Sequence, residues 1–222
     1  MRQYNRCPDL YPTRRASVSR AYAEFVVGPA HKFQRLPDTV GYDDAALLDT
    51  DAVGLHAEHL SGPTINARVA VIGAGPIGHG QTMLAKASGA DVLIIGTVPH
   101  ALDLARRLGA DETMDSSQAD PIAAVMAMTG GLGADVAFEC AGGESMPETL
   151  PLATRLVRRG GGVVIVGGFD DGETAIPLEW QRIQMSAIRL IPSASFAFQD
   201  IHSEKVAVLD LVRAASCRRS LW

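Results

Sequence analysis

The chain has 222 residues, and 47% of them are hydrophobic, which is ample for a packed core and argues against disorder. Its formal net charge is −5 with both signs interspersed, so nucleic acid is not expected as the main partner. The longest apolar runs are about as long as a strand and the first residues lack a signal-peptide pattern, so we expect a cytoplasmic protein without a membrane partner.

The first third of the chain contains few predicted elements. Residues 1–20 are rich in arginine and lack an apolar period, which indicates an extended arm. The alternation in residues 21–27 and the segment 32–36 favour two short strands, which would need partners. A helical pattern follows over residues 43–59, and a Ser-Gly-Pro break then separates it from the next strand.

A glycine-rich stretch in the middle of the sequence organises the rest. Residues 68–72 suit a buried parallel strand and lead directly into Gly73, Gly75 and Gly78, while residues 77–88 have helical spacing. A strand, a tight turn and a helix start present unpaired amides and the positive end of the helix dipole to a ligand. This stretch therefore predicts a pyrophosphate site.

Strands and helices continue to alternate after the turn. Further strands are predicted at residues 91–95, 136–139 and 163–166, with an edge strand at 188–191, and further helices at 101–108, 122–128, 149–158 and 203–215. Strands that are apolar throughout indicate burial on both faces. The expected fold class is α/β, with a doubly wound parallel sheet.

Several segments in order resemble the medium-chain dehydrogenase/reductase superfamily, in its zinc-type, sorbitol and threonine dehydrogenase-like branch. They are G-Y-D-D-A-A-L-L-D-T-D-A-V-G-L-H-A, V-A-V-I-G-A-G-P-I-G, A-R-R-L-G-A-D, D-V-A-F-E-C-A-G and G-G-V-V-I-V-G-G. The resemblance implies a Rossmann-type NAD(P)-binding domain over residues 61–195. It also implies a remnant of a GroES-like catalytic domain over 1–60 and a C-terminal helix and tail over 196–222, the family pattern being truncated at both ends.

The cofactor contacts are expected at the carboxyl edge of the sheet, where open α/β sheets bind ligands. Together with the resemblance, this rule gives Gly73, Gly75, Pro76, Ile77, Gly78, Gly96, Thr97, Cys140, Ala141, Gly142, Val166, Gly167 and Gly168. For the thiol of Cys140 itself we favour a small buried hydrophobic group.

The end of the second strand bears on the choice of cofactor. An NAD site has an acid there for the ribose 2′-hydroxyl, but this chain has Gly96 followed by Thr97. Removing the carboxylate removes repulsion against a 2′-phosphate, so we favour NADP over NAD. Thr97, His100 and either Arg106 or Arg107 are the candidates to meet the phosphate.

The resemblance also implies zinc, but the ligands are mostly absent. Cys7 falls where the family has its last structural cysteine, and Asp49 where a glutamate near the catalytic zinc is common. One thiolate cannot make a tetrahedral site. His56 and His59 lie one helical turn apart, but we expect solvated or packed histidines, so no catalytic or metal residue is assigned. The three cysteines are expected as thiols.

Two functions stay open at this point. The first is an NAD(P)-dependent oxidoreductase that moves a hydride between a nicotinamide and a secondary alcohol or polyol. The second is a nucleotide-binding fragment or pseudoenzyme without turnover. An S-adenosylmethionine methyltransferase shares a glycine-rich turn, but Pro76 and the absent acid argue against it. The resemblance also implies a homodimer through the sheet edge near Ile188.

Overall fold

The computed structural model describes residues 23–27, 33–168, 175–195 and 204–219. The chain divides into two compact units, one formed by residues 1–49 and 197–222 and the other by residues 50–196. The second unit contains the whole sheet and the glycine-rich turn. The three-part division expected from the sequence stays a prediction.

The sheet of the second unit has six parallel strands in the order β3-β2-β1-β4-β5-β6. The strands are β1 Arg68–Ile72, β2 Asp91–Gly96, β3 Glu112–Asp115, β4 Ala134–Glu139, β5 Val157–Ile165 and β6 Arg189–Pro192. Because β1 lies between β2 and β4, the strand order reverses at β1. This topology confirms the expected doubly wound α/β fold. In such folds a ligand binds at the carboxyl ends of the strands where the order reverses, here β1 and β4.

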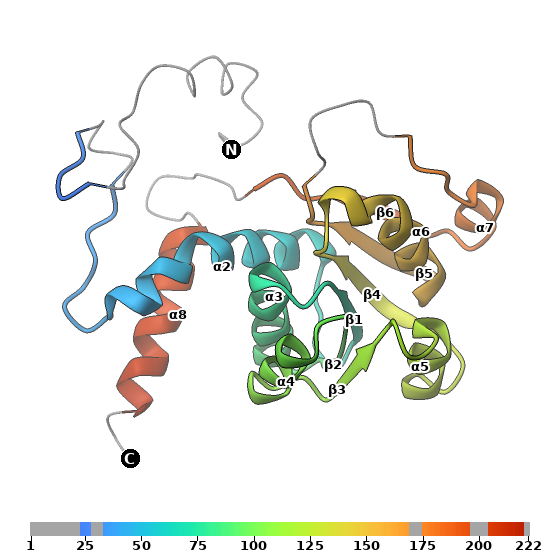
Figure 1. Cartoon of the computed structure of the whole chain (residues 1–222), viewed down its shortest axis with the longest axis horizontal. Helices are drawn as coiled ribbons and strands as arrows, with labels where there is room; N and C mark the ends of the chain where they lie inside the picture. Colours follow the sequence, from blue (N-terminus) through green and yellow to red (C-terminus); the bar gives the residue numbers. More distant parts are fainter. Residues whose placement is uncertain (1–22, 28–32, 169–174, 196–203, 220–222) are drawn as a thin grey trace. The chain divides into compact units, whose positions relative to one another are not determined.

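Helices connect these strands and cover both faces of the sheet (Figure 1). They are α3 Pro76–Ala87, α4 Pro99–Arg107, α5 Pro121–Met128, the short 3₁₀-helix η3 Gly143–Ser145, α6 Met146–Leu156 and α7 Trp180–Met185. The chain also forms α2 Tyr42–Ser61 before β1 and α8 Glu204–Arg219 near its end. None of the helices in the ranges given above is long and apolar enough to cross a membrane.

Two apolar clusters make up the core, one on each face of the sheet. Val69 and Val71 of β1 point into the cluster shared with α2, α3 and α4, whereas Ala70 and Ile72 point into the one shared with α5 and α6. Successive side chains of a strand point to opposite faces, so a strand that is apolar throughout needs cover on both. The run Arg68–Ile72 therefore specifies a central strand.

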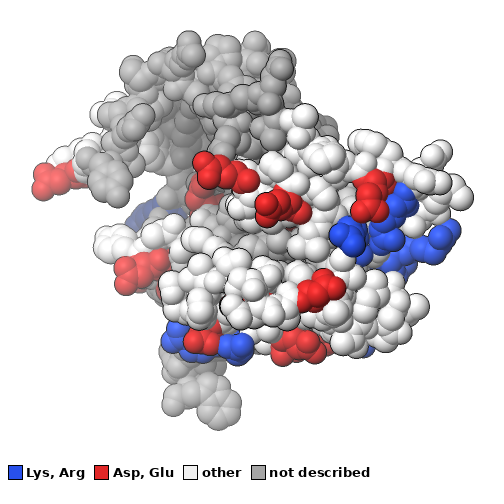
Figure 2. Space-filling view, turned by 45° about the vertical axis from the view of Figure 1, so that its right-hand side comes forward, with Lys and Arg blue, Asp and Glu red and all other residues white. Residues whose placement is uncertain are grey.

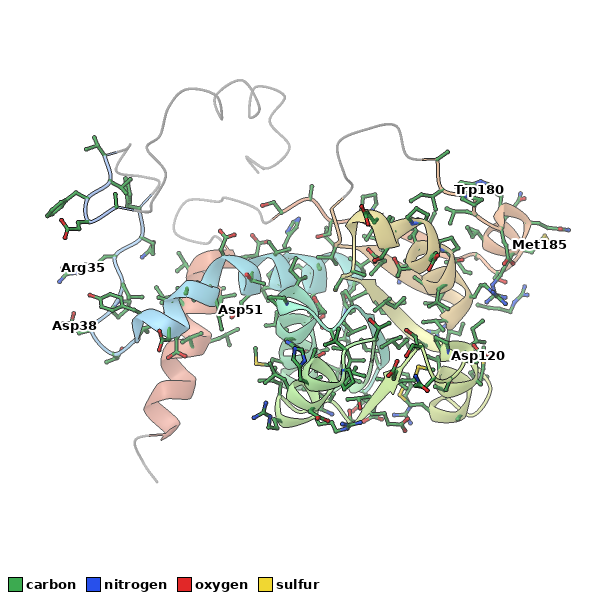
Figure 3. All side chains as sticks on the ribbon, viewed as in Figure 1. Arg35, Asp38, Asp51, Asp120, Trp180 and Met185 are labelled. Carbon is green, nitrogen blue, oxygen red and sulfur yellow. The ribbon has the colours of Figure 1, made fainter. Side chains whose placement is uncertain are left out.

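The strands expected at residues 21–27 and 32–36 were wrong where the structure describes them. Residues 23–27 and 33–36 have no strand hydrogen-bonding pattern, and Phe25 and Val27 are each 87% exposed. A short alternating segment forms a strand only when another strand pairs with it, and none does so among the described residues. Figure 3 shows this irregular stretch at Arg35 and Asp38.

Ion pairs and hydrogen bonds of charged side chains connect the amino ends of β1, β2, β4 and β5. Arg68 forms an ion pair with Asp91, and the Arg68 amide donates to Asp135 Oδ2 at 2.7 Å, while Arg158 Nε donates to Asp135 Oδ1 at 2.6 Å. Burial raises the pKa of Asp135, but these hydrogen bonds and charges outweigh it and hold the pKa below its usual value. Figure 2 shows one group of Lys and Arg side chains at the right of the view and a smaller one at the lower left, whereas Asp and Glu are spread more widely.

Candidate functional site

The turn after β1 contains Gly73, Gly75 and Gly78, and the structure requires glycine at two of these three positions. Gly73 has a φ of +101°, and a Cβ there would lie 2.7 Å from the Ala141 nitrogen. A Cβ at Gly78 would collide with the Gly73 carbonyl oxygen. Gly75, in contrast, would meet nothing within 4 Å. The first and third glycines therefore close the turn, and the second leaves open space above it.

The start of α3 can receive an anion in that space. Gly75 is the N-cap and Pro76 the first helical residue, with no acidic residue in the first turn. The first amides of a helix have no carbonyl partner inside the helix, so those of Ile77 and Gly78 are available. The positive end of the helix dipole adds to the attraction. This is the arrangement that binds a pyrophosphate in glycine-rich turns of this kind.

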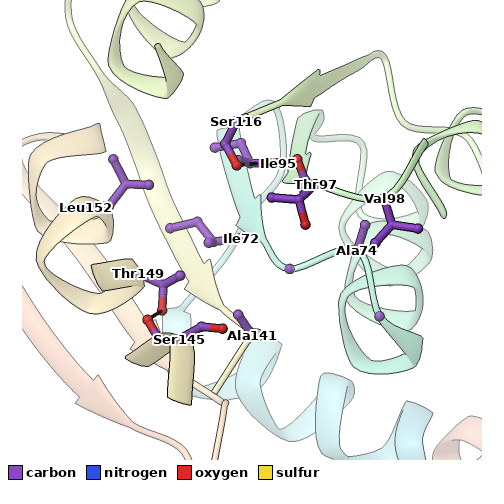
Figure 4. A pocket seen from close by; sticks show the side chains of 13 residues that line it. Ile72, Ala74, Ile95, Thr97, Val98, Ser116, Ala141, Ser145, Thr149 and Leu152 are labelled. Carbon is purple, nitrogen blue, oxygen red and sulfur yellow. Dashed lines mark hydrogen bonds between the residues drawn. The ribbon is translucent and has the colours of Figure 1, made fainter. Parts of the chain in front are cut away.

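A cavity of about 300 Å³ lies next to the turn, at the carboxyl edge of the sheet (Figure 4). Five of the residues expected from the sequence line it: Gly73, Gly75, Gly96, Thr97 and Ala141. The other lining residues are Ile72, Ala74, Ile95, Val98, Ser116, Ser145, Thr149 and Leu152. In Figure 4, Thr97 and Ser116 lie on one side of Ile72, and Thr149 and Ser145 on the other. The cavity thus joins the glycine-rich turn to the ends of β2, β3 and β4.

The end of β2 is polar but uncharged. The Ser116 amide donates to the Gly96 carbonyl oxygen at 2.9 Å, which places Ser116 beside Thr97. A Cβ at Gly96 would lie 2.9 Å from the Cβ of Ala74 and 3.3 Å from Leu102 Cδ2. Thr97 and Ser116 therefore supply hydroxyls where an NAD site has a carboxylate.

The remaining expected residues lie along the same edge without lining this cavity. They are Pro76, Ile77, Gly78, Cys140, Gly142, Val166, Gly167 and Gly168. The ends of β4 and β5 contact each other here, since a Cβ at Gly142 would lie 2.9 Å from the Gly168 nitrogen and the Gly143 amide donates to the Gly168 carbonyl at 2.8 Å. Their contacts with a cofactor stay predictions.

The environment of Cys140 bears on its chemistry. Its side chain is buried in the cluster shared with α3 and α4. Burial, and then the charge of Glu139, raises the pKa of the thiol far above its usual value. A thiolate is the nucleophilic and metal-binding form, so the burial of Cys140 and its raised pKa favour a packing role over a reactive one.

The sequence missed the lining residues on the β3 and α6 sides. Ser116 follows β3, whose polar sequence Glu-Thr-Met-Asp gave no strand signal. Ser145 and Thr149 lie on η3 and at the start of α6, which begins three residues before the predicted helix. A serine or threonine just after a strand end was the available signal, but only the pairing of β3 with β2 places Ser116 at the cavity.

The described residues do not fit a zinc ion. Among residues 23–27, 33–168, 175–195 and 204–219, no three His, Cys, Asp or Glu side chains are grouped closely enough to hold a metal. His56 is 4% exposed on α2, whereas His59 is exposed. Cys7 lies outside the described residues. No step of a reaction is therefore assigned to zinc.

A comparison with protein families identifies the family of the chain. A family model described as zinc-binding dehydrogenase matches residues 76–212. The chain belongs to this family. This match confirms the resemblance to the medium-chain, zinc-type alcohol dehydrogenase family found in the sequence.

Individual relatives support the same family. Sorbitol dehydrogenase from Bacillus subtilis is 32% identical over 166 residues, which cover 74% of this chain and 46% of the relative. The structure of 2R,3R-butanediol dehydrogenase from Bacillus subtilis matches with a TM-score of 0.70 and 31% identity, covering 82% of this chain and 49% of that chain.

A third match carries a cofactor. A protein from Sinorhizobium meliloti, described as a zinc-binding dehydrogenase and solved with NADP bound, matches with a TM-score of 0.72 and 26% identity. This match covers 96% of this chain and 63% of that chain. The chain spans about half the length of the curated relatives it matches.

Proposed function

We propose that this chain binds a nicotinamide dinucleotide and is the cofactor-binding part of an NAD(P)-dependent alcohol or polyol dehydrogenase. The observation that supports this most strongly is the joining of the glycine-rich turn, the end of β2 and the end of β4 around one cavity. A Rossmann sheet binds a dinucleotide across this point, where the strand order reverses.

The chain's own residues bind and orient the cofactor. The open space above Gly75 and the amides at the start of α3 take the pyrophosphate. Thr97 and Ser116 hold the adenosine ribose at the ends of β2 and β3, and the ends of β4 and β5 take the nicotinamide side. The bound nicotinamide supplies hydride transfer at its C4 atom. No described residue is assigned as the acceptor of the hydroxyl proton of the alcohol.

NADP is the proposed cofactor rather than NAD. The cavity has no charged lining residue, so nothing there repels a 2′-phosphate. The Thr97 hydroxyl is a donor for its oxygens, and so is the Ser116 hydroxyl if it gives up its long hydrogen bond of 3.4 Å to the Gly96 carbonyl oxygen. His100 is exposed, and Arg106 pairs with Asp103 at 2.5 Å, so neither side chain lines the cavity. The Sinorhizobium meliloti relative solved with NADP is consistent with this preference.

The proposed substrate class is a polyol or secondary alcohol. It follows from relatives named sorbitol dehydrogenase and 2R,3R-butanediol dehydrogenase. A nucleotide-binding role without turnover remains the second candidate, because the described residues do not group three metal ligands. A homodimer through β6, the last strand of the sheet order, also stays a prediction.

The binding proposal is tested by thermal unfolding of the purified chain with NADPH, NADH or S-adenosylmethionine. Saturation at a hundred times Kd stabilises a folded protein by about 2.7 kcal/mol, which is about 5–10 °C for a protein of this size. We expect a shift with both dinucleotides and a larger one with NADPH. A shift with S-adenosylmethionine alone would refute the proposal.

Turnover and bound metal separate the two candidate functions. The chain is assayed with sorbitol and 2,3-butanediol, with and without added zinc, and its zinc content is measured. Binding of NADPH without turnover supports the nucleotide-binding role for this chain. Turnover that requires one zinc per chain would show that ligands outside the described residues complete the site.

A further inference from the structure

Glu139, the last residue of β4, has a fully buried side chain whose two oxygens differ in their contacts. Oε1 accepts hydrogen bonds from the amides of Ala141 at 3.0 Å and Gly142 at 3.1 Å, and it lies 2.8 Å from the Thr149 hydroxyl. Oε2 has no hydrogen-bond partner among the described residues. The two amides therefore converge on one oxygen together with the Thr149 hydroxyl, which also lies 3.0 Å from the Ser145 carbonyl oxygen and so has a second acceptor.

The groups held by Oε1 belong to the cofactor site. Ala141 and Thr149 both line the cavity, one after the end of β4 and the other in the first turn of α6. The Ala141 nitrogen is also the atom nearest to the position of a Cβ on Gly73, the first glycine of the turn. One carboxyl group thus fixes a strand end and a helix start on the same side of the cavity.

The main chain of Glu139 extends these contacts to β5. Its carbonyl oxygen accepts from the amides of Val166 at 2.9 Å and Gly167 at 2.8 Å. A Cβ on Gly167 would lie 2.5 Å from Oε2, so only glycine leaves room for the carboxyl group. Glu139 therefore contacts both strand-end segments that the sequence assigned to the cofactor, residues 140–142 and 166–168.

Burying this group without full satisfaction is costly. A buried acceptor that lacks a partner loses its hydration without compensation, so a buried carboxyl group destabilises a core unless its hydrogen bonds offset that loss. In a glutamine at this position, the amide oxygen could accept from the same groups as Oε1, but it is a weaker acceptor than a carboxyl oxygen of a glutamate, and the amide nitrogen would lie buried at the position of Oε2, where the described residues offer no partner. We look for the role of the carboxyl group in the groups that it positions.

We propose that Glu139 is a positioning residue for cofactor binding, which holds Ala141 and Thr149 in the geometry that the dinucleotide requires. This inference rests on the proposed function for its link to the dinucleotide. Glu139 does not line the cavity, so it acts through the groups it holds. A role limited to stability would affect unfolding alone.

The experiment compares the full chain with Glu139→Gln, Thr149→Val and Thr149→Ser. Thr154→Val is the control, because Thr154 is a buried threonine on the same helix whose hydroxyl bonds to the Pro151 carbonyl at 2.7 Å and which does not line the cavity. Each protein is measured for Kd with NADPH and NADH, for its thermal midpoint, and for amide exchange at residues 141 and 142 without ligand.

We expect about tenfold weaker binding of both dinucleotides in Glu139→Gln and Thr149→Val, from weakened or lost bonds to the carboxyl group. Thr149→Ser keeps the hydroxyl and should bind both dinucleotides more tightly than Thr149→Val does. Thr154→Val should lower the thermal midpoint about as much as Thr149→Val does and leave Kd for both dinucleotides unchanged. Amide exchange at residues 141 and 142 should accelerate in Glu139→Gln.

Two results would overturn the inference. One is a Kd in Glu139→Gln and Thr149→Val equal to that of the unmodified chain, measured where all three proteins are folded to the same extent. Glu139 would then contribute to stability only. The other is unchanged exchange at residues 141 and 142 in Glu139→Gln, which decides against positioning even if the unmodified chain binds no dinucleotide. Absence of binding in the unmodified chain would refute the proposed function separately.

Discussion

Replacement of Gly96 tests whether the missing carboxylate sets the cofactor preference. Gly96 ends β2 and lines the cavity, at the position where an NAD site has an acid. Any side chain at this position meets the Cβ of Ala74 at 2.9 Å and Leu102 Cδ2 at 3.3 Å. Since Ala74 belongs to the glycine-rich turn, Gly96→Ala measures the steric cost, and Gly96→Asp adds a carboxylate to the same cost.

The expected change follows from the added charge. A hydrogen bond to a charged group contributes about 1.5–3 kcal/mol, which corresponds to a tenfold to hundredfold change in Kd. The carboxylate would accept from the ribose 2′-hydroxyl of NADH and repel the 2′-phosphate of NADPH. We therefore expect Kd for NADPH relative to NADH to rise at least tenfold in Gly96→Asp compared with Gly96→Ala.

The assay is a titration of each variant with both reduced dinucleotides, followed by nicotinamide fluorescence. Gly96→Ala should weaken both dinucleotides by a similar factor, because its effect is steric. The reasoning is refuted if Gly96→Asp and Gly96→Ala have the same ratio of Kd values. It is also refuted if the unmodified chain binds NADH more tightly than NADPH, since the uncharged end of β2 would then have another role.

Three further outcomes are expected. Gly78→Ala should lower the thermal midpoint and abolish cofactor binding, because its Cβ would collide with the Gly73 carbonyl oxygen. Gly75→Ala should weaken binding at an unchanged thermal midpoint, because its Cβ would meet nothing within 4 Å. Burial raises the pKa of Asp111, but the hydrogen bonds from Lys86 and the Val92 amide outweigh it, so the pKa is lowered. Asp111 therefore stabilises the folded chain above about pH 4, and this contribution is lost as the pH falls further. Urea unfolding at several pH values should show a shallower acid loss in Asp111→Asn. Asp120→Ala (Figure 3) should cost about 1 kcal/mol, because Asp120 Oδ1 caps α5 by accepting from the Ile122 amide at 2.9 Å, and an unchanged urea midpoint would contradict this.

The fold could be predicted where the local pattern and the tertiary structure agree. The run Arg68–Ile72 is apolar at every inner position and buried on both faces, so its sequence alone identified a central parallel strand. The elements β3 and α7 were missed because Glu-Thr-Met-Asp is polar and Trp180–Met185 is short. The strand β5 begins at Val157, six residues before the predicted start, in a stretch of arginine and glycine that only pairing with β4 makes a strand.

The candidate site could be predicted only in part for the same reason. Gly73, Gly75 and Gly78 are local features, because a turn of fixed length determines which of them must lack a Cβ. Ser116 and Thr149 reach the cavity through strand pairing and helix packing across many residues of sequence. The strands expected at residues 21–27 and 32–36 were wrong, where the structure describes them, for the opposite reason: their pattern was local, and none of the described residues pairs with them as a partner strand.

The strand order also has a consequence for how the chain folds. Strands β1, β2 and β3 follow one another along the chain and pair over short sequence separations, as Arg68 with Asp91. The pairing of β1 with β4, as Val69 with Val136, closes a segment of the chain that is roughly three times as long. Loop closure over a longer segment is slower, so we expect β4 to dock after the first three strands. Because Ala141 and Thr149 reach the cavity only after that step, the cavity is completed late in folding. A bound dinucleotide should therefore slow unfolding of the finished sheet and leave the folding rate almost unchanged.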